Sequence, residues 1–317
     1  MQMSGAMMGW CRRLRVLPLL VLAWLASCGG GTQQIEPFQA QRVIFIGDET
    51  VGLLPDGRRY GINAINADSN FDCAQLPIWT QQIAASYGFP TDHCGAGTLA
   101  VTRAAANAKA ADIEAQLNAQ FATGVTSKDL YVVMVGMNDI IELYENYAGD
   151  RHCDSGNSNP PAGTLMGELA ARGRLVAAQI SRILAAGGRA IVSTTHDLGY
   201  SPYAAIKNLI APGQSTLLSC MTAVYNARVR VDIRPLDGRL WGLVLADDDT
   251  VAAVRGAIGA TNVTDAACTV APPACTTATL VNPQATSYLW ATDRHFGPLM
   301  HNQLGNEAIA RARNNPF

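Results

Sequence analysis

Short apolar runs alternate along the chain with longer segments in which apolar residues recur every three or four positions. The short runs have the length of buried strands and are followed by Gly, Thr or Asp: residues 42–46, 130–135, 190–193 and 240–246. The longer segments predict helices over residues 78–87, 104–121, 140–147, 165–186, 217–231, 251–258 and 304–312. This alternation predicts a parallel sheet that helices cover on both faces.

We therefore expect residues 41–317 to form one α/β domain, a three-layer α/β/α sandwich with a mainly parallel, flavodoxin-like central sheet. The segment 262–286, which is rich in Thr, Pro and Ala, is expected to be an irregular excursion. In such sheets the functional groups lie beyond the carboxyl ends of the strands. The loops after the four predicted strands are therefore the places where chemistry is expected.

The first residues have the pattern of a secretion signal. Three arginines precede a ten-residue apolar run, 16–25, which is too short to span about 30 Å of hydrocarbon as a helix. The following Leu-Ala-Ser-Cys, which ends at Cys28, resembles a bacterial lipobox. This resemblance implies that residues 1–27 are removed, that Cys28 is acylated, and that residues 28–40 tether an exported domain to a lipid bilayer. Gly29 favours the outer membrane, and an ordinary signal peptide with an incidental Cys28 is the alternative.

The composition narrows the classes of partner. The chain has 317 residues, of which 49% are hydrophobic and 15% are charged, and its formal net charge is -2. The hydrophobic content excludes a disordered chain, and the near-neutral balance provides no field for a phosphate backbone, so we expect no nucleic-acid partner. Neither a glycine-rich phosphate loop nor a metal-binding spacing of Cys and His is present, and we expect no cofactor and no metal.

Besides Cys28 and one cysteine within the predicted signal, the chain has six cysteines. An even number in an exported chain favours disulfides, and a zinc site is the alternative, which no CxxC motif supports. Six cysteines allow fifteen pairings, among which the sequence does not choose. Pairing of near neighbours is our hypothesis, and it joins Cys73 to Cys94 and Cys268 to Cys275, leaving Cys153 and Cys220 for each other.

Three short motifs follow predicted strands or precede the last predicted helix. They are GDET at residues 47–50, GMND at residues 136–139 and TDRH at residues 292–295. In this order, over residues 41–313, they resemble the SGNH or GDSL hydrolase family. That resemblance implies a serine nucleophile in the first motif, an oxyanion hole from a backbone N–H and the asparagine of the second, and a histidine base that an acid three residues earlier orients.

The resemblance assigns roles to residues of this chain one by one. Asn138 would donate its side-chain amide to the oxyanion, and His295 would be the base. The second oxyanion donor would be the backbone of Asn107, which stands where the family has glycine. Thr292 occupies the position of the orienting acid, so Asp293, one residue along, is the possible orienter.

Glu49 stands where the family has its serine nucleophile. Four roles are open: a nucleophile that forms a covalent intermediate, a general base that activates water, a bystander beside a nucleophilic Thr50, or a structural group that fills the oxyanion pocket and pairs with protonated His295. The first two roles imply an exported, lipid-anchored hydrolase of ester bonds in lipid, glycan or polymer substrates. The last implies a catalytically inactive surface lipoprotein that binds glycan or acyl ligands.

The remaining polar candidates have simpler explanations. We expect His196, which follows the third strand, in a surface loop, and we expect His301 to be solvated near the start of the last helix. Asp139 and the aspartates 247–249 are expected to cap the helices that follow them. Trp290 is expected to be either a pocket wall or a core residue.

Overall fold

The structure is a computed structural model that describes residues 37–157 and 160–314. The predicted signal peptide, residues 1–27, lies outside the described residues, as do Cys28 and the tether up to residue 36. These roles, and the domain boundaries built on them, remain predictions. Within the described ranges, no helix combines the length and the apolar character that crossing a membrane requires.

Five parallel strands form the central sheet, in the order β4-β1-β5-β6-β7. They are β1 (Arg42–Gly47), β4 (Ala100–Thr102), β5 (Asp129–Met134), β6 (Arg189–Ser193) and β7 (Trp241–Val244). Four of them lie where the apolar runs predict strands, and the predicted parallel sheet is confirmed. The sequence pattern does not predict β4, because its three residues are too few to show a periodicity.

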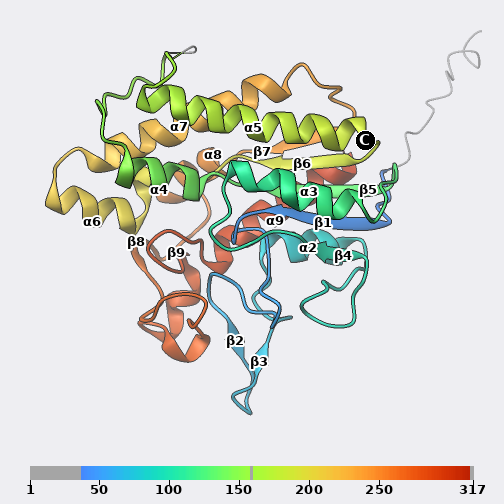
Figure 1. Ribbon diagram of the computed structural model, residues 1–317. Helices are drawn as coiled ribbons and strands as arrows, with labels where there is room; N and C mark the ends of the chain where they lie inside the picture. The colour runs from blue at the N-terminus through green and yellow to red at the C-terminus, as the bar shows by residue number, and fades with distance from the viewer. Residues whose placement is uncertain (1–36, 158–159, 315–317) are drawn as a thin grey trace, which may run out of the picture. The chain divides into compact units, whose positions relative to one another are not determined.

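Helices cover both faces of the sheet (Figure 1). They are α2 (Trp79–Ser86), α3 (Ile113–Phe121), α4 (Met137–Asn146), α5 (Leu165–Ala185), α6 (Pro202–Ile210), α7 (Gln214–Ile233), α8 (Ala246–Val254) and α9 (Pro298–Asn314). Ile44 and Ile46 of β1 share a buried cluster with α3, α5 and α7, whereas Val43 and Phe45 share another with α2 and α9. Because side chains alternate between the faces of a strand, these clusters are the two interfaces of a three-layer α/β/α sandwich.

Among the described residues, four further strands lie outside the central sheet. β2 (Ala64–Ile65) and β3 (Phe71–Asp72) form an antiparallel hairpin, and β8 (Asn262–Ala266) runs parallel to β9 (Tyr288–Trp290). The predicted excursion 262–286 therefore contains one strand, followed by irregular chain and short 3-10 turns.

The predicted helix over residues 104–121 begins only at Ile113, and residues 104–109 form a loop. The helix propensity of the alanines is overridden because the loop makes tertiary hydrogen bonds, such as the one from the Ala105 N–H to the Gly47 carbonyl at 3.1 Å. The loop is thereby attached to the turn that follows β1.

Two helices begin earlier than the pattern predicts. Because α4 begins at Met137, Asp139 lies in its first turn and does not cap it. Because α8 begins at Ala246, the aspartates 247–249 lie inside its first turn, and its N-cap residue is Leu245, which has no polar side chain to cap it. The capping predictions are therefore wrong, although carboxylates in a first turn still interact favourably with the helix dipole.

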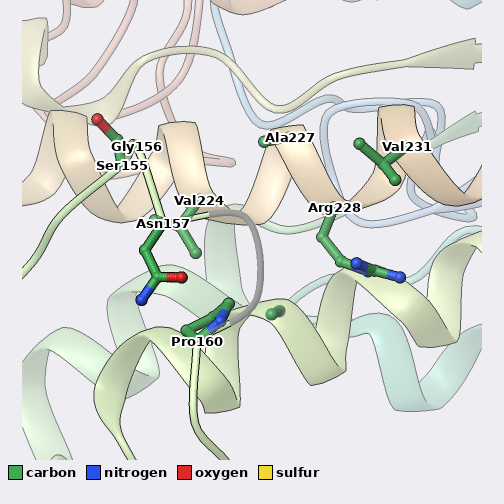
Figure 2. A pocket seen from close by; sticks show the side chains of 9 residues that line it. Ser155, Gly156, Asn157, Pro160, Val224, Ala227, Arg228 and Val231 are labelled. Atoms are coloured by element: carbon green, nitrogen blue, oxygen red, sulfur yellow. The ribbon is translucent and has the colours of Figure 1, made fainter.

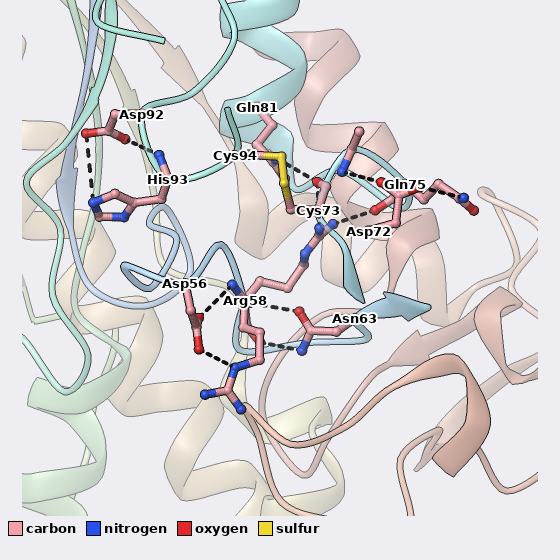
Figure 3. Close-up of a disulfide and its surroundings, with 12 residues drawn as sticks. Asp56, Arg58, Asn63, Asp72, Cys73, Gln75, Gln81, Asp92, His93 and Cys94 are labelled. Atoms are coloured by element: carbon pink, nitrogen blue, oxygen red, sulfur yellow. Dashed lines mark hydrogen bonds and ion pairs between the residues drawn. A yellow bond between two sulfur atoms is a disulfide. The ribbon is translucent and has the colours of Figure 1, made fainter. Parts of the chain in front are cut away.

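Disulfides join the six cysteines in the pairs formed by near neighbours. The Cα–Cα distances are 5.6 Å for Cys73–Cys94, 6.1 Å for Cys153–Cys220 and 5.8 Å for Cys268–Cys275. Figure 3 shows the first pair beside Gln81 of α2, whose side chain donates to the Cys73 carbonyl at 3.1 Å. The hypothesis of near-neighbour pairing is confirmed, and the third pair closes a loop that borders the site described next.

Candidate active site

The turn that carries Glu49 follows β1 and is fixed by close backbone packing. Gly47 has a φ of 140°, and a Cβ there would lie 1.8 Å from the carbonyl oxygen of Met134 in β5, so only glycine fits. The Gln116 side chain clamps the same glycine, accepting from its N–H at 2.8 Å and donating to its carbonyl at 2.9 Å. The turn therefore presents Glu49 at the carboxyl end of the sheet in a defined position.

Thr50 is held away from the centre of the site. Its backbone N–H and its hydroxyl both donate to Asp48 Oδ1, at 2.9 and 2.5 Å, and its carbonyl accepts from Trp79 Nε1 at 2.9 Å. Burial, reinforced by the neighbouring charge of Glu49, raises the pKa of Asp48 well above its ordinary value. Because the Thr50 hydroxyl is bound to Asp48 and not to His295, the geometry contradicts Thr50 as the nucleophile.

The Glu49 carboxylate lies among the groups that the family resemblance assigns to the oxyanion hole. Its Oε2 accepts from the Asn107 N–H at 2.8 Å and from Asn138 Nδ2 at 3.0 Å. Its Oε1 lies 3.4 Å from His295 Nε2. Glu49 is only 7% exposed. Folding therefore brings four of the five predicted site residues together, and the carboxylate is at their centre.

The surroundings of Glu49 favour its ionised form. Burial acts to raise the pKa of Glu49, but the interactions with His295 and with the backbone N–H groups of Glu49 and Asn107 outweigh it, and the pKa lies below its ordinary value. An ionised carboxylate is only an acceptor, so its oxygens match the N–H groups around them. The site holds a satisfied anion in its ground state.

His295 comes from the loop between β9 and α9, and Thr292 Oγ1 lies 2.8 Å from its Nδ1. The Asp293 carboxylate pairs instead with the guanidinium of Arg294, at distances from 2.6 to 3.1 Å. The prediction that Asp293 orients His295 is therefore wrong, because a displacement of one residue in this turn directs its side chain to Arg294. Threonine takes the place of the acid.

The two amide donors are held by α4 and by the loop before α3. Asn107 has a φ of 60°, the left-handed region, which Asn adopts more readily than most residues. Asn138 Nδ2 also donates to the Ala108 carbonyl at 3.2 Å, and the Asp139 carboxylate accepts from the Ala110 N–H at 2.9 Å. Burial raises the pKa of Asp139 to about 6. Through this hydrogen bond, Asp139 fixes the loop that carries Asn107 to α4.

A cavity of about 470 Å³ opens beside the carboxylate. This volume is in the range of small-molecule sites, about 300–1,000 Å³. Most of the lining residues belong to two groups, which are the polar residues around Glu49 and the loop closed by Cys268–Cys275. The full lining is Glu49, Tyr60, Asn107, Asn138, Ala266, Cys268, Thr269, Val270, Ala271, Pro272, Thr292, Asp293, Arg294 and His295. In residues 37–157 and 160–314, no three His, Cys, Asp or Glu side chains are arranged to hold a metal ion.

Two histidines expected to be exposed are buried beside the site. The His196 ring lies 4.5 Å from Phe296 and 5.6 Å from Trp290, between centroids, and His301 packs edge-on against Phe296 at 6.3 Å. Burial lowers the pKa of both histidines to about 3, so both are neutral near pH 7. The expectations of a surface loop and a solvated ring are wrong, and Trp290 belongs to the core.

A smaller cavity of about 140 Å³ lies at α5 and α7 (Figure 2). Ala170 of α5 and Val224 and Val231 of α7 line it, together with residues of the loop before α5. The guanidinium of Arg228 at its edge is paired with Asp232 at 2.7 Å. This cavity therefore offers no convergent set of free polar groups.

The solved structures similar to this chain include a GDSL-like lipase and several acetyl xylan esterases. A putative GDSL-like lipase from Parabacteroides merdae has 14% identity, a TM-score of 0.46, and alignment coverage of 86% of this chain and 97% of that one. The acetylxylan esterase Axe2 from Geobacillus stearothermophilus has 13% identity and a TM-score of 0.43, and the alignment covers 87% of this chain and 95% of that one. The acetyl xylan esterase AlAXEase has 11% identity and a TM-score of 0.44, and the alignment covers 84% of this chain and 96% of that one.

No protein-family model matches the chain, and no curated protein matches it either. At these identities and scores, the likeness to the solved structures does not assign an activity.

Proposed function

We propose that this protein binds glycan or acyl ligands in a pocket laid out like the active site of an SGNH-type ester hydrolase, and that it does not cleave them by serine chemistry. The observation that carries the proposal is the place of the Glu49 carboxylate. Its Oε2 accepts from both the Asn107 N–H and Asn138 Nδ2, at 2.8 and 3.0 Å. These are the two donors that a hydrolase of this type would aim at the oxyanion of its substrate.

Glu49 has the covalent shape of an acylated serine. In an acyl-serine, the side chain runs from Cβ through Oγ to a carbonyl carbon, and in glutamate it runs from Cβ through Cγ to the carboxyl carbon. Oε2 therefore stands for the acyl oxygen, and Oε1, 3.4 Å from His295 Nε2, takes the in-plane place of the acyl group's first carbon. The side chain is a permanent mimic of the intermediate that a serine enzyme forms and releases.

A permanent mimic opposes turnover in two ways. Loss of the nucleophile in a triad enzyme costs on the order of 10⁶ in kcat, and loss of a single oxyanion donor costs about 10²–10³. Here both donors are occupied by a full negative charge, which also repels a developing oxyanion. The open cavity beside Glu49 stays available to a ligand.

We propose further that the protein is exported and works in the bacterial cell envelope, anchored to a lipid bilayer through Cys28. The lipobox-like sequence that ends at Cys28 supports the anchor. Three disulfides support an oxidising compartment, because cytosolic proteins rarely keep them.

A hydrolase in which Glu49 is itself the nucleophile or the base is the second candidate. The 3.4 Å between Glu49 Oε1 and His295 Nε2 favours it, because a carboxylate and an imidazole in direct contact can relay a proton from a water that lies beside them in the cavity. This reading requires Glu49 to leave its two amide donors during the reaction, since the substrate oxygen needs them.

Hydrolysis of p-nitrophenyl acetate separates the two candidates. We expect the wild type, Glu49→Ala and His295→Ala to release nitrophenol at the same background rate as Glu114→Ala, a control at an exposed carboxylate of α3. Wild-type turnover that both site variants lose, and the control keeps, would establish the hydrolase instead.

Ligand binding is tested by titrating acetylated and deacetylated xylo-oligosaccharides and short-chain fatty acids while the Asn107 amide resonance is followed. Saturable shifts support the binding role, and unchanged resonances with every probe contradict it.

A further inference from the structure

The Thr292 hydroxyl oxygen already accepts from two backbone N–H groups. The nitrogen of Arg294 lies 3.4 Å from Thr292 Oγ1, and the nitrogen of His295 lies 3.2 Å from it. A hydroxyl has two acceptor lone pairs and one proton. With both lone pairs engaged, the proton is what remains to face His295 Nδ1, which lies 2.8 Å away. Thr292 is buried, so bulk water does not compete for this proton.

We propose that Thr292 is a positioning residue that holds His295 in its neutral Nε2–H tautomer. The Nδ1 atom accepts from the Thr292 hydroxyl, so the ring proton is on Nε2, and Nε2 faces Glu49 Oε1 at 3.4 Å. In this state the imidazole donates to the carboxylate and has no free lone pair with which to remove a proton. His295 is therefore a hydrogen-bond donor to Glu49 and not a base.

An aspartate at the same position would impose the opposite tautomer. A carboxylate only accepts, so it requires the proton on Nδ1 and leaves Nε2 as the base, which is how a Ser-His-Asp triad is arranged. The glutamate and the threonine thus form a matched pair, since Glu49 needs a donor and Thr292 makes His295 one. This inference rests on the proposed function, because it treats the filled oxyanion pocket as the resting state.

The tautomer can be read from long-range ¹H–¹⁵N correlations of the histidine rings at pH 7.5. In the wild type we expect His295 to show one protonated nitrogen, Nε2, and an unprotonated Nδ1. Thr292→Ser keeps the hydroxyl and should give the same pattern. Thr292→Val is close in shape but lacks the donor, and it should displace the Nδ1 resonance. Thr292→Asp should protonate Nδ1. His295→Asn identifies the signals.

A wild-type spectrum with a protonated Nδ1, either as the other tautomer or as imidazolium, would overturn the inference. So would identical Nδ1 resonances in the wild type and Thr292→Val. Each outcome is separable from the proposed function, because ester hydrolysis by the wild type refutes the binding role whatever the tautomer, and a protonated Nδ1 without hydrolysis refutes only the role of Thr292.

Discussion

Replacing Glu49 by serine and Thr292 by aspartate together should turn the pocket into a serine esterase. The first change removes the carboxylate, which frees the Asn107 N–H and Asn138 Nδ2 for a substrate oxygen and supplies a hydroxyl. The second places an acceptor where Thr292 Oγ1 now lies 2.8 Å from His295 Nδ1, and so moves the ring proton to that nitrogen.

The expected gain in rate follows from the one defect that each single variant retains. Thr292→Asp alone lacks a nucleophile and should stay at background, since that loss costs on the order of 10⁶. Glu49→Ser alone has the nucleophile but the wrong tautomer of His295, a fault that costs about 10⁴ in a triad enzyme. We therefore expect the double variant to exceed Glu49→Ser by about 10²–10⁴ in kcat/KM.

The assay is p-nitrophenyl acetate hydrolysis, with active sites counted by a fluorophosphonate probe that labels the new serine. Glu49→Ser combined with Thr292→Asn is the matched control, because asparagine has the shape of aspartate without its charge. Equal rates for the two double variants would refute the role given to the tautomer. Folded double variants that neither hydrolyse the ester nor react with the probe would refute the hydrolase-like layout of the site.

Three further predictions concern the vacated pocket, the buried histidines and the disulfides. Glu49→Ala should bind acetate, whose four heavy atoms equal those removed, with a Kd on the order of 1–10 mM seen as a shift of the Asn107 amide. The wild type, in which this N–H already donates to Glu49 Oε2, should bind acetate more weakly, and equal affinities would contradict an occupied oxyanion pocket. Because burial lowers the pKa of His196 to about 3, below the unfolded value of about 6.5, the unfolded chain binds more protons between these limits. The free energy of unfolding should therefore fall as the pH is lowered below 6.5. In urea titrations, His196→Phe should reduce the slope of this free energy against pH by about 1.4 kcal/mol per pH unit. An unchanged slope would contradict a neutral buried ring. Removing the Cys153–Cys220 disulfide, whose residues are 67 apart in the sequence, should lower the free energy of unfolding by about 4 kcal/mol. Removing Cys268–Cys275, whose residues are 7 apart, should lower it by only about 2.5 kcal/mol. If the second variant had the lower urea midpoint, the loop-entropy explanation would be contradicted.

The central sheet was predictable because buried parallel strands read as continuous apolar runs. The runs before Gly47 and Gly136 predict β1 and β5, and these strands lead into the turn with Glu49 and into α4, which carries Asn138. The loop with Asn107 was not predictable from its alanines, because helix propensity is a weak local term that tertiary hydrogen bonds override. A strand as short as β4 likewise gives too little pattern to recognise.

Within the site, the sequence motifs predicted that Glu49 and His295 lie together, but they did not identify the residue that orients His295. Thr292 stands three residues before His295, at the expected spacing, yet its chemistry is that of a donor rather than an acid. Gln116 had no sequence signal, because its role depends on reaching Gly47 across 69 residues of chain. His196 shows the same limit, since nothing local distinguishes a buried loop histidine from an exposed one.

The most direct test of the account is a high-resolution crystal structure of residues 37–317 near pH 7. It should show Glu49 Oε2 within about 3.2 Å of both the Asn107 nitrogen and Asn138 Nδ2, the upper limit of an ordinary N–H···O bond, with no water between them. A Glu49 side chain turned into the cavity, with water bound to the two amides in its place, would contradict the claim that the carboxylate fills the oxyanion pocket.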